Sequence, residues 1–391
     1  MNILNGKLKG RHIMASEGTS QIVGERIKQA RLYREMTQED LADLLGIKKQ
    51  TISKYEKGDI TISTDIIFKL RNALKFPVKF FYTPYTNSEK KESIIYFRTK
   101  NIPKKTQAHL EQTIRLLDEQ IMPFYLQYID FPKPDIPDLS KYISYGTCGY
   151  KKEDIKVVAQ KLREYWNLGE KPIGNLAYLL QTKGFILIKK EISQNKTDGF
   201  SKWINNIPYI ITSSNKDSAV RSRFDHAHEL GHLILHNGVG EEEQGSKHIE
   251  QDADYFASEF LYPSDVFIEE IKELPLSMET FIRLKEKWKI SIQALIRKCL
   301  DLHLISEEKY TYFQKRISFK GWRTREPLDN VLVIEKPRIL RDAAELLLEH
   351  NKITKQQIAD EIPLDKDDII DLCNLPKDFF SENLSKIIKI Y

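Results

Sequence analysis

One short stretch of the sequence combines residues that bind metal with a residue that can move a proton. His228 and His232 are four residues apart, and Glu229 directly follows the first of them. On a helix, two histidines at this spacing lie on one face and can bind the same Zn²⁺, while the glutamate points toward a water on that metal. Bound Zn²⁺ lowers the pKa of such a water, and a carboxylate can take its proton as the water attacks a peptide carbonyl. The spacing therefore predicts a zinc-dependent peptide hydrolase with His228 and His232 as ligands and Glu229 as the catalytic base.

A catalytic zinc site needs a third protein ligand and keeps its fourth position for water. The next helical stretch offers Glu250 and Asp254, four residues apart on one face. We assign Glu250 as the third ligand and Asp254 as the carboxylate that orients a ligating imidazole. His236 is a competing candidate, but residues at successive four-residue steps drift around a helix by about 40° per step. We therefore interpret His236 as a helix-end histidine without metal.

Other side chains near the motif have two interpretations each. Tyr209 and Tyr262 could stabilise an oxyanion, although packing is the favoured role for both. Arg221 and Arg223 directly precede the motif and could bind a substrate carboxylate, although support of the helix is favoured. The residue that stabilises the oxyanion is left open.

Residues 37–58 predict two short helices joined by a turn that contains Gly46. Four apolar residues would pack inward: Leu41, Leu45, Ile47 and Ile52. The second helix would present a polar face made of Lys48, Lys49, Gln50, Ser53 and Lys54. Lysine can reach guanine edges, glutamine can pair with adenine, and lysines and hydroxyls hold phosphates. The segment is therefore predicted to bind a double-stranded DNA operator.

Charge is distributed unevenly along the 391 residues. Residues 1–85 hold 15 Lys and Arg against 9 Asp and Glu, whereas the rest of the chain holds 46 against 47. A basic N-terminal part on a neutral body favours a nucleic-acid module at that end.

The length predicts two or three domains. Three prolines, Pro132, Pro134 and Pro137, mark an extended linker. We divide the chain into a DNA-binding domain at 20–83, a helical and Pro-rich linker at 84–149, a metallopeptidase domain at 150–316 and a helical region at 317–391. Residues 354–362 faintly echo the helix that follows Thr37, but no internal repeat is detected.

Several protein classes are excluded by composition. No apolar run approaches the roughly 18 residues that span a bilayer, and the N-terminus lacks the apolar core of a secretory signal. The three cysteines, Cys148, Cys299 and Cys373, are odd in number and far apart, which excludes a disulfide scaffold. We therefore expect a cytoplasmic protein without membrane partners.

Residues 22–81 closely resemble the Cro/C1-type (XRE) helix-turn-helix family. The resemblance is carried by Thr37-Gln38, by Ile52-Ser53 and by Glu56 before Lys57-Gly58. It implies an all-α, lambda-repressor-like fold and a homodimer on two half-sites. It also implies that Gln38 contacts the DNA backbone, while Lys49, Gln50 and Lys54 face bases.

Residues 150–265 resemble the ImmA/IrrE family of zinc metallopeptidases. The histidine motif is followed by a helix that carries Glu250, Ala253, Asp254, Phe256 and Ala257, and Tyr262 stands where methionine is common. The resemblance implies a gluzincin-like α+β fold and cleavage of transcriptional repressors during stress or mobile-element induction. The expected fold class is thus multidomain and mostly α, with an α+β part.

Three hypotheses follow. The leading one is a DNA-binding regulator whose zinc endopeptidase domain cleaves a repressor or its own chain. The alternative is a non-proteolytic DNA-binding repressor or antitoxin-like regulator whose zinc domain is a sensor or interaction platform. A third, a free peptidase that uses the basic helices to recognise proteins, predicts no salt-dependent DNA binding.

Overall fold

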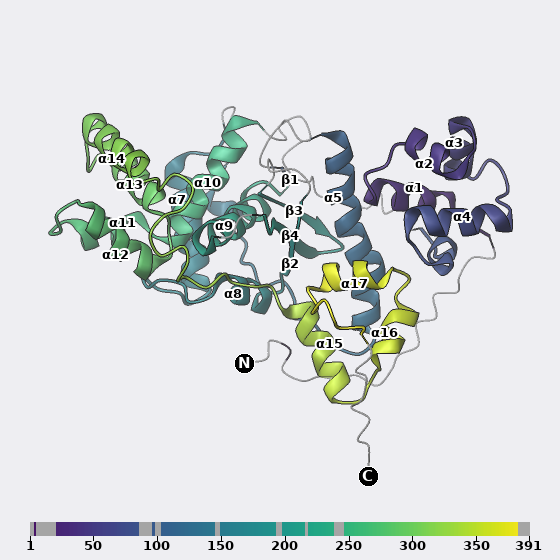
Figure 1. Ribbon diagram of the computed structural model, residues 1–391. Coiled ribbons are helices and arrows are strands. Elements are labelled where there is room, and N and C mark those ends of the chain that lie inside the picture. Colours follow the sequence, from purple (N-terminus) through teal and green to yellow (C-terminus); the bar gives the residue numbers. More distant parts are fainter. Residues whose placement is uncertain are drawn as a thin grey trace, which may run out of the picture. The chain divides into compact units, whose positions relative to one another are not determined.

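The computed structural model describes residue 4 and residues 21–85, 96–97, 103–144, 149–192, 198–215, 218–237 and 246–381. By its internal contacts the chain divides into two compact units (Figure 1). Unit 1 comprises residues 1–90, 103–131 and 338–391, and unit 2 comprises residues 91–102 and 132–337. The predicted C-terminal region, 317–391, is thus divided between the two units. Helices dominate both, and unit 2 adds a small sheet, so the predicted fold class is confirmed.

Unit 1 is built from helices alone among its described residues. They are α1 (Gly24–Tyr33), α2 (Gln38–Leu45), α3 (Lys49–Lys57), α4 (Thr64–Leu74), the short η1 (Val78–Tyr82), α5 (Lys104–Leu116), the π-helical turn η2 (Leu117–Ile121), α6 (Met122–Leu126), α15 (Ile339–Glu349), α16 (Lys355–Glu361) and α17 (Lys366–Cys373).

The helix-turn-helix forms where the sequence predicts it. Thr37 caps α2 by accepting a hydrogen bond from the amide of Asp40, whose carboxylate accepts one from the amide of Thr37 in return. Gly46 ends α2 and Gly58 ends α3 with φ values of 69° and 74°, a left-handed conformation that glycine adopts without strain. Inside the module, the buried Arg31 donates hydrogen bonds to both carboxylate oxygens of Glu56. These contacts fix α3 against α1.

Unit 2 combines a sheet with a larger set of helices. The strands are β1 (Tyr96–Phe97), β2 (Ile186–Lys190), β3 (Gly199–Ile204) and β4 (Ile207–Ser213). The helices are the short η3 (Ser140–Tyr142), α7 (Lys152–Tyr165), α8 (Leu176–Thr182), α9 (Ala219–Leu235), α10 (Lys247–Leu261), α11 (Ser264–Ile271), α12 (Met278–Trp288), α13 (Ile292–Asp301) and α14 (Glu307–Phe319).

The sheet has the strand order β1-β3-β4-β2. Strands β3 and β4 form an antiparallel hairpin, and β2 pairs with β4 in parallel. The hairpin turns at Asn205 and Asn206, whose φ values of 48° and 62° suit asparagine. Helix α9 contacts both β3 and β4 and packs on α10. This arrangement brings the predicted zinc motif next to β3.

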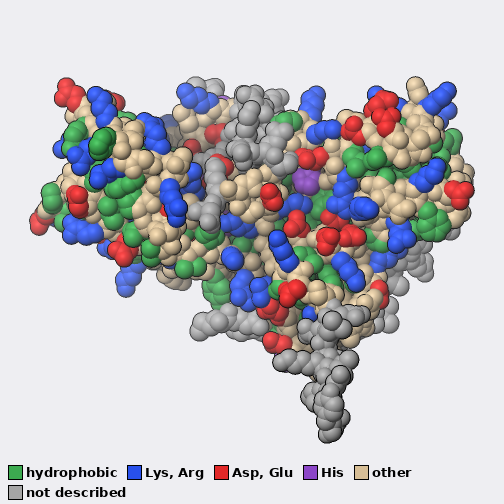
Figure 2. Space-filling model, viewed as in Figure 1, with side chains coloured by type: hydrophobic (Ala, Val, Ile, Leu, Met, Phe, Trp, Pro, Cys, Tyr) green, Lys and Arg blue, Asp and Glu red, His purple; other side chains and the backbone are tan. Residues whose placement is uncertain are grey.

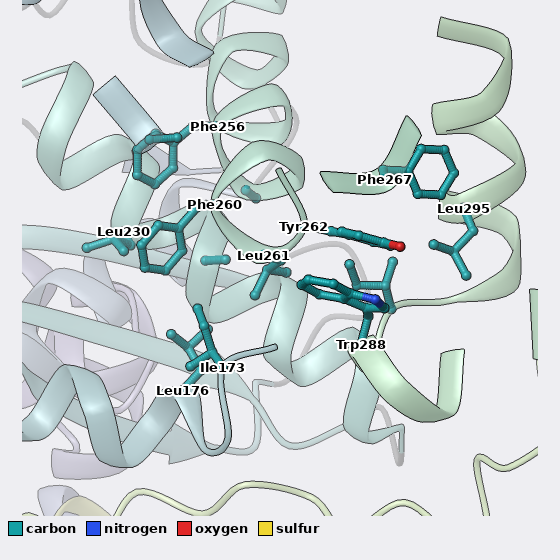
Figure 3. Packing of buried hydrophobic residues seen from close by; sticks show 14 of the residues in the cluster. Ile173, Leu176, Leu230, Phe256, Phe260, Leu261, Tyr262, Phe267, Trp288 and Leu295 are labelled. Atoms are coloured by element: carbon teal, nitrogen blue, oxygen red, sulfur yellow. The ribbon is translucent and has the colours of Figure 1, made fainter. Parts of the chain in front are cut away.

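The core of unit 2 lies around α9, α10 and the helices that follow them. Figure 3 shows the Phe256 and Phe260 rings near Leu230. On the other side of α10, the Tyr262 ring lies flat on the Trp288 indole, with ring centroids 3.7 Å apart. Burial of these large rings holds the carboxyl-terminal helices to the motif helices.

The surface carries both signs of charge. On the face drawn in Figure 2, Lys and Arg side chains are interspersed with Asp and Glu side chains, in keeping with the net charge of +5. No helix of the described residues has the length and apolarity needed to cross a membrane.

Candidate functional site

The two helices that carry the predicted metal ligands approach each other closely. A Cβ atom at Gly231 of α9 would lie 3.1 Å from the Phe256 ring and 3.3 Å from the Cα of Ala253 on α10. A larger residue at Gly231 would push the helices apart. Two small residues at the crossing therefore let the histidines of α9 face the first turns of α10.

The predicted ligands meet at one point. The Nε2 atoms of His228 and His232 are 3.0 Å apart. Glu250 places one oxygen 3.3 Å from Nε2 of His228 and the other 3.6 Å from Nε2 of His232. One ligand atom from each residue lies within 4.8 Å of the others. Two imidazoles and a carboxylate in this arrangement are a donor set that suits Zn²⁺.

The hydrogen bonding of Glu250 supports a cation at this point. Both of its carboxylate oxygens are buried, and neither accepts a hydrogen bond from the described residues. A buried carboxylate without a donor is costly unless a cation neutralises it. The three residues therefore fit a metal ion.

Each of the two histidines contacts a further side chain through its other ring nitrogen, Nδ1. His228 directs its Nδ1 to the Asp254 carboxylate at 2.8 Å, which leaves its Nε2 lone pair toward the cluster. His232 directs its Nδ1 to Nδ1 of His236 at 3.0 Å. The Nε2 atom of His236 in turn faces the Asp252 carboxylate at 3.8 Å. Burial lowers the pKa of His236, which favours the neutral ring that can accept a hydrogen bond from Nδ1 of His232.

The predicted base is held by the sheet. Glu229 is buried, and its Oε2 accepts a hydrogen bond of 2.7 Å from the hydroxyl of Ser201 on β3. A Cβ atom at Gly199, also on β3, would lie 2.9 Å from Oε1 of Glu229. A larger residue at this position would require the Glu229 carboxylate to shift. The sequence did not predict either residue, because local spacing does not show which residues of a strand will pack against a distant helix.

The other residues named from the sequence lie outside the metal cluster. The Tyr262 hydroxyl donates to Glu270 at 2.9 Å, and its ring packs on Trp288, while Tyr209 is buried in β4. Arg221 donates to the carbonyl of Arg323 at 3.1 Å. These contacts account for Tyr262 and Arg221 without a catalytic role.

Arg223 supports the fold. Its buried guanidinium donates to Glu335 and to the carbonyl of Ile173. Glu335 also accepts from the amides of Leu176 and Ala177 at the start of α8. Arg223 therefore ties α9 to α8, as the favoured interpretation expected.

His226 is a core residue. It is fully buried, contacts Thr212 at 3.2 Å, and burial lowers its pKa to about 3.

The predicted DNA-contacting residues lie on one module. Lys48, Lys49, Gln50 and Lys54 are exposed on and before α3, and Ser53 is half-buried. Gln38 is half-buried at the start of α2, where its amide donates to Glu56 at 2.7 Å. The exposed lysines are available to phosphates, while Gln38 is anchored within the module.

Replacing His236 by asparagine is expected to weaken Zn²⁺ binding by about 10–100-fold, because His232 loses the group that orients it. Competition with a chromogenic chelator measures this affinity. The matched control is His226→Asn, since His226 is equally buried on α9, the helix that His236 directly follows, and its ring contacts Thr212 instead of the cluster. Equal affinities in His236→Asn and wild type would contradict the orienting role.

Comparison with known proteins assigns the N-terminal helices and the domain that carries the histidine motif to known families. Residues 27–81 match a family described as helix-turn-helix, and residues 181–300 match the IrrE N-terminal-like domain of the M78 peptidase family. The chain is 31% identical over 77 residues to a Rhodospirillum rubrum protein named as a transcriptional regulator in the ATPase CF(0) region, a match that covers 20% of this chain and 71% of that protein.

Two rhizobial proteins named as HTH-type transcriptional regulators are also similar. The one from Sinorhizobium fredii is 31% identical over 81 residues, which covers 21% of this chain and 57% of that protein. The one from Sinorhizobium medicae is 40% identical over 60 residues, which covers 15% of this chain and 43% of that protein. The chain therefore belongs to the helix-turn-helix transcriptional regulators and carries an M78-type, IrrE N-terminal-like peptidase domain in addition.

Proposed function

We propose that the chain is a cytoplasmic DNA-binding regulator whose IrrE-like domain is a zinc-dependent endopeptidase that cleaves a transcriptional repressor, or its own chain, in a stress or mobile-element response. The observation that carries this proposal is the convergence of His228, His232 and Glu250 within 4.8 Å, beside the buried Glu229. A homodimer on two operator half-sites is part of the proposal.

The chemistry follows from the donors and the base. Zn²⁺ held by His228, His232 and Glu250 would supply an acidified water and polarise the scissile carbonyl. Glu229 takes the proton of the attacking water and passes it to the leaving amine. Ser201 keeps the Glu229 carboxylate in place through its 2.7 Å hydrogen bond.

The alternative is a non-proteolytic repressor or antitoxin-like regulator whose zinc domain is a sensor or interaction platform. A site that only stabilises structure needs no base beside the metal, and Glu229 occupies that place. Mapping of new protein N-termini in cells that express wild type or Glu229→Gln distinguishes the two. Under our proposal, a DNA-binding protein or the chain itself gains a new N-terminus with wild type only. Identical N-termini in both strains would favour the alternative.

DNA binding is expected to weaken steeply with salt. A mixed-sequence duplex titrated at several salt concentrations should give a log–log slope that falls by about 1 in magnitude for Lys54→Ala, because each phosphate contact releases counterions. Lys69→Ala is the matched control, since Lys69 is exposed on α4 outside the predicted face. Binding without salt dependence would support a free peptidase whose basic helices recognise proteins.

A further inference from the structure

The last three helices of unit 1 repeat the spacing of the DNA-binding module. Thr37 caps α2 and Lys48 precedes α3, and the same number of residues separates Thr354, which caps α16, from Asp365, which caps α17. Thr354 forms a reciprocal capping box with Gln357, as Thr37 does with Asp40. The faint echo at residues 354–362 therefore extends to the spacing and capping of two successive helices.

Buried positions repeat as well. Counted from the capping threonine, three buried residues of the first module have buried counterparts in the second: Leu41 and Ile358, Leu45 and Ile362, and Ile52 and Ile369. In a helix-turn-helix, positions of this kind form the buried inner face. Helix α15 precedes the pair, as α1 precedes α2.

The residue types at the positions predicted to face DNA do not repeat. By the same count, Asp365 stands for Lys48, Asp367 for Gln50 and Asp371 for Lys54, while Lys366 stands for Lys49. Asp367 and Asp371 are exposed. Carboxylates at positions that would face phosphates oppose DNA binding.

The second module is instead attached to the first. Asp368 at the start of α17 is buried, and its carboxylate accepts from Arg34 at 2.7 Å and 2.5 Å and from the Tyr33 hydroxyl at 3.2 Å. Arg34 also donates to the carbonyls of Leu74 and Lys75 at the end of α4. The acidic helix thus contacts the junction of α1 and α4.

Two further contacts hold the second module in unit 1. The Lys79 ammonium on η1 donates to the carbonyl of Asp360 in α16. At the end of α17, the Cys373 sulfur lies 4.0 Å from the Tyr125 hydroxyl on α6. The module is therefore fixed at both of its last helices.

We infer that residues 339–374 form a second helix-turn-helix module that does not bind DNA and whose partner is the α1–α4 module of the same chain, docked through Asp368. One chain then carries two helix-turn-helix folds but a single DNA-reading helix, α3. The inference rests on the DNA-binding part of the proposed function and is independent of peptidase activity.

The docking contact is tested by hydrogen–deuterium exchange on the full chain. Asp368→Asn should speed exchange in α1 and α17 by about tenfold, because the partly buried Arg34 loses its counter-charge. Asp367→Asn, which removes the same charge from an exposed neighbour, should change exchange in these helices less than about twofold. Equal exchange in the two variants would overturn the docking role.

A folding defect is separated from loss of docking by two measurements. Exchange in α9 and α10 of unit 2 should be unchanged in Asp368→Asn. Tyr33→Phe, which removes only the hydroxyl that donates to Asp368, should speed exchange in the same two helices by a smaller factor. No acceleration in Tyr33→Phe, together with general unfolding of Asp368→Asn, would also overturn the inference.

The claim that α3 is the single DNA-reading helix is tested by binding to a mixed-sequence duplex. The double variant Lys48→Asp, Lys54→Asp gives the first module two of the three outer carboxylates of the second, those that correspond to Asp365 and Asp371. It should lower affinity by at least about 100-fold, with no salt-dependent binding left. Retained salt-dependent binding that is abolished only when α17 is also altered would show that the second module binds DNA. If wild type binds no DNA, the DNA-binding part of the proposed function fails, while the exchange experiment still decides the docking.

Discussion

Replacement of Glu229 by glutamine is expected to lower kcat/KM for peptide cleavage by about 10²–10⁴-fold, the range that a general base contributes. Glutamine has nearly the same shape and can still accept a hydrogen bond from Ser201, but it cannot take a proton from water. The variant should therefore keep the wild-type zinc content. Cleavage of the identified substrate, followed by mass spectrometry, measures the effect.

A graded control uses the residue that holds the base. Ser201→Ala leaves the Glu229 carboxylate in the site without its 2.7 Å hydrogen bond, so we expect a loss of about tenfold, well short of the Glu229→Gln effect. Wild-type turnover in Glu229→Gln with bound zinc would exclude Glu229 as the base.

Replacement of Lys285 by methionine is expected to lower the free energy of unfolding by about 3–5 kcal/mol, the usual cost of removing one partner of a buried ion pair. Lys285 is fully buried on α12 and donates to Glu326 at 2.8 Å and to Asp329 at 2.6 Å. Methionine fills the space, but two buried carboxylates then lose their common cation. Urea denaturation measures the change.

The matched control for this prediction lies on the same helix. The Lys287 ammonium donates to Glu270 at 2.6 Å, but its side chain is 53% exposed, so Lys287→Met should cost no more than about 1 kcal/mol. Equal losses of stability in the two variants would contradict the account of the buried cluster.

The residues of the candidate metal site could be predicted because they are set by local geometry. His228 and His232 share a helix face, as do Glu250 and Asp254, and the four-residue spacing that places them is visible in the sequence. The structure brings all four together. Their roles as ligands and orienting group stay predictions until a metal is measured.

The surroundings of the site could not be predicted. Ser201 and Gly199 meet Glu229 only because β3 packs against α9 in one register, and that register is a long-range property. The prediction that His236 binds no metal rests on its position on the helix, whereas its contact with His232 depends on side-chain rotamers. Side-chain rotamers depend on packing and cannot be predicted from the spacing of residues in the sequence.

The grouping of α15–α17 with the N-terminal helices was equally hidden. The sequence of residues 354–362 faintly resembles part of the DNA-binding module. The contact of Asp368 with Arg34, however, joins residues more than 300 positions apart. A periodic sequence pattern indicates which residues are close within a few helical turns, and it cannot show that the C-terminal helices pack against the N-terminal ones.

The central claim is that His228, His232 and Glu250 bind a catalytic Zn²⁺, and elemental analysis of the purified chain tests it most directly. We expect about one Zn²⁺ per chain in wild type and in Glu229→Gln, and little or none in His232→Ala and Glu250→Ala, since three protein ligands are the minimum for such a site. Wild type that holds no zinc at neutral pH even after reloading, or ligand variants that hold as much as wild type, would contradict the account.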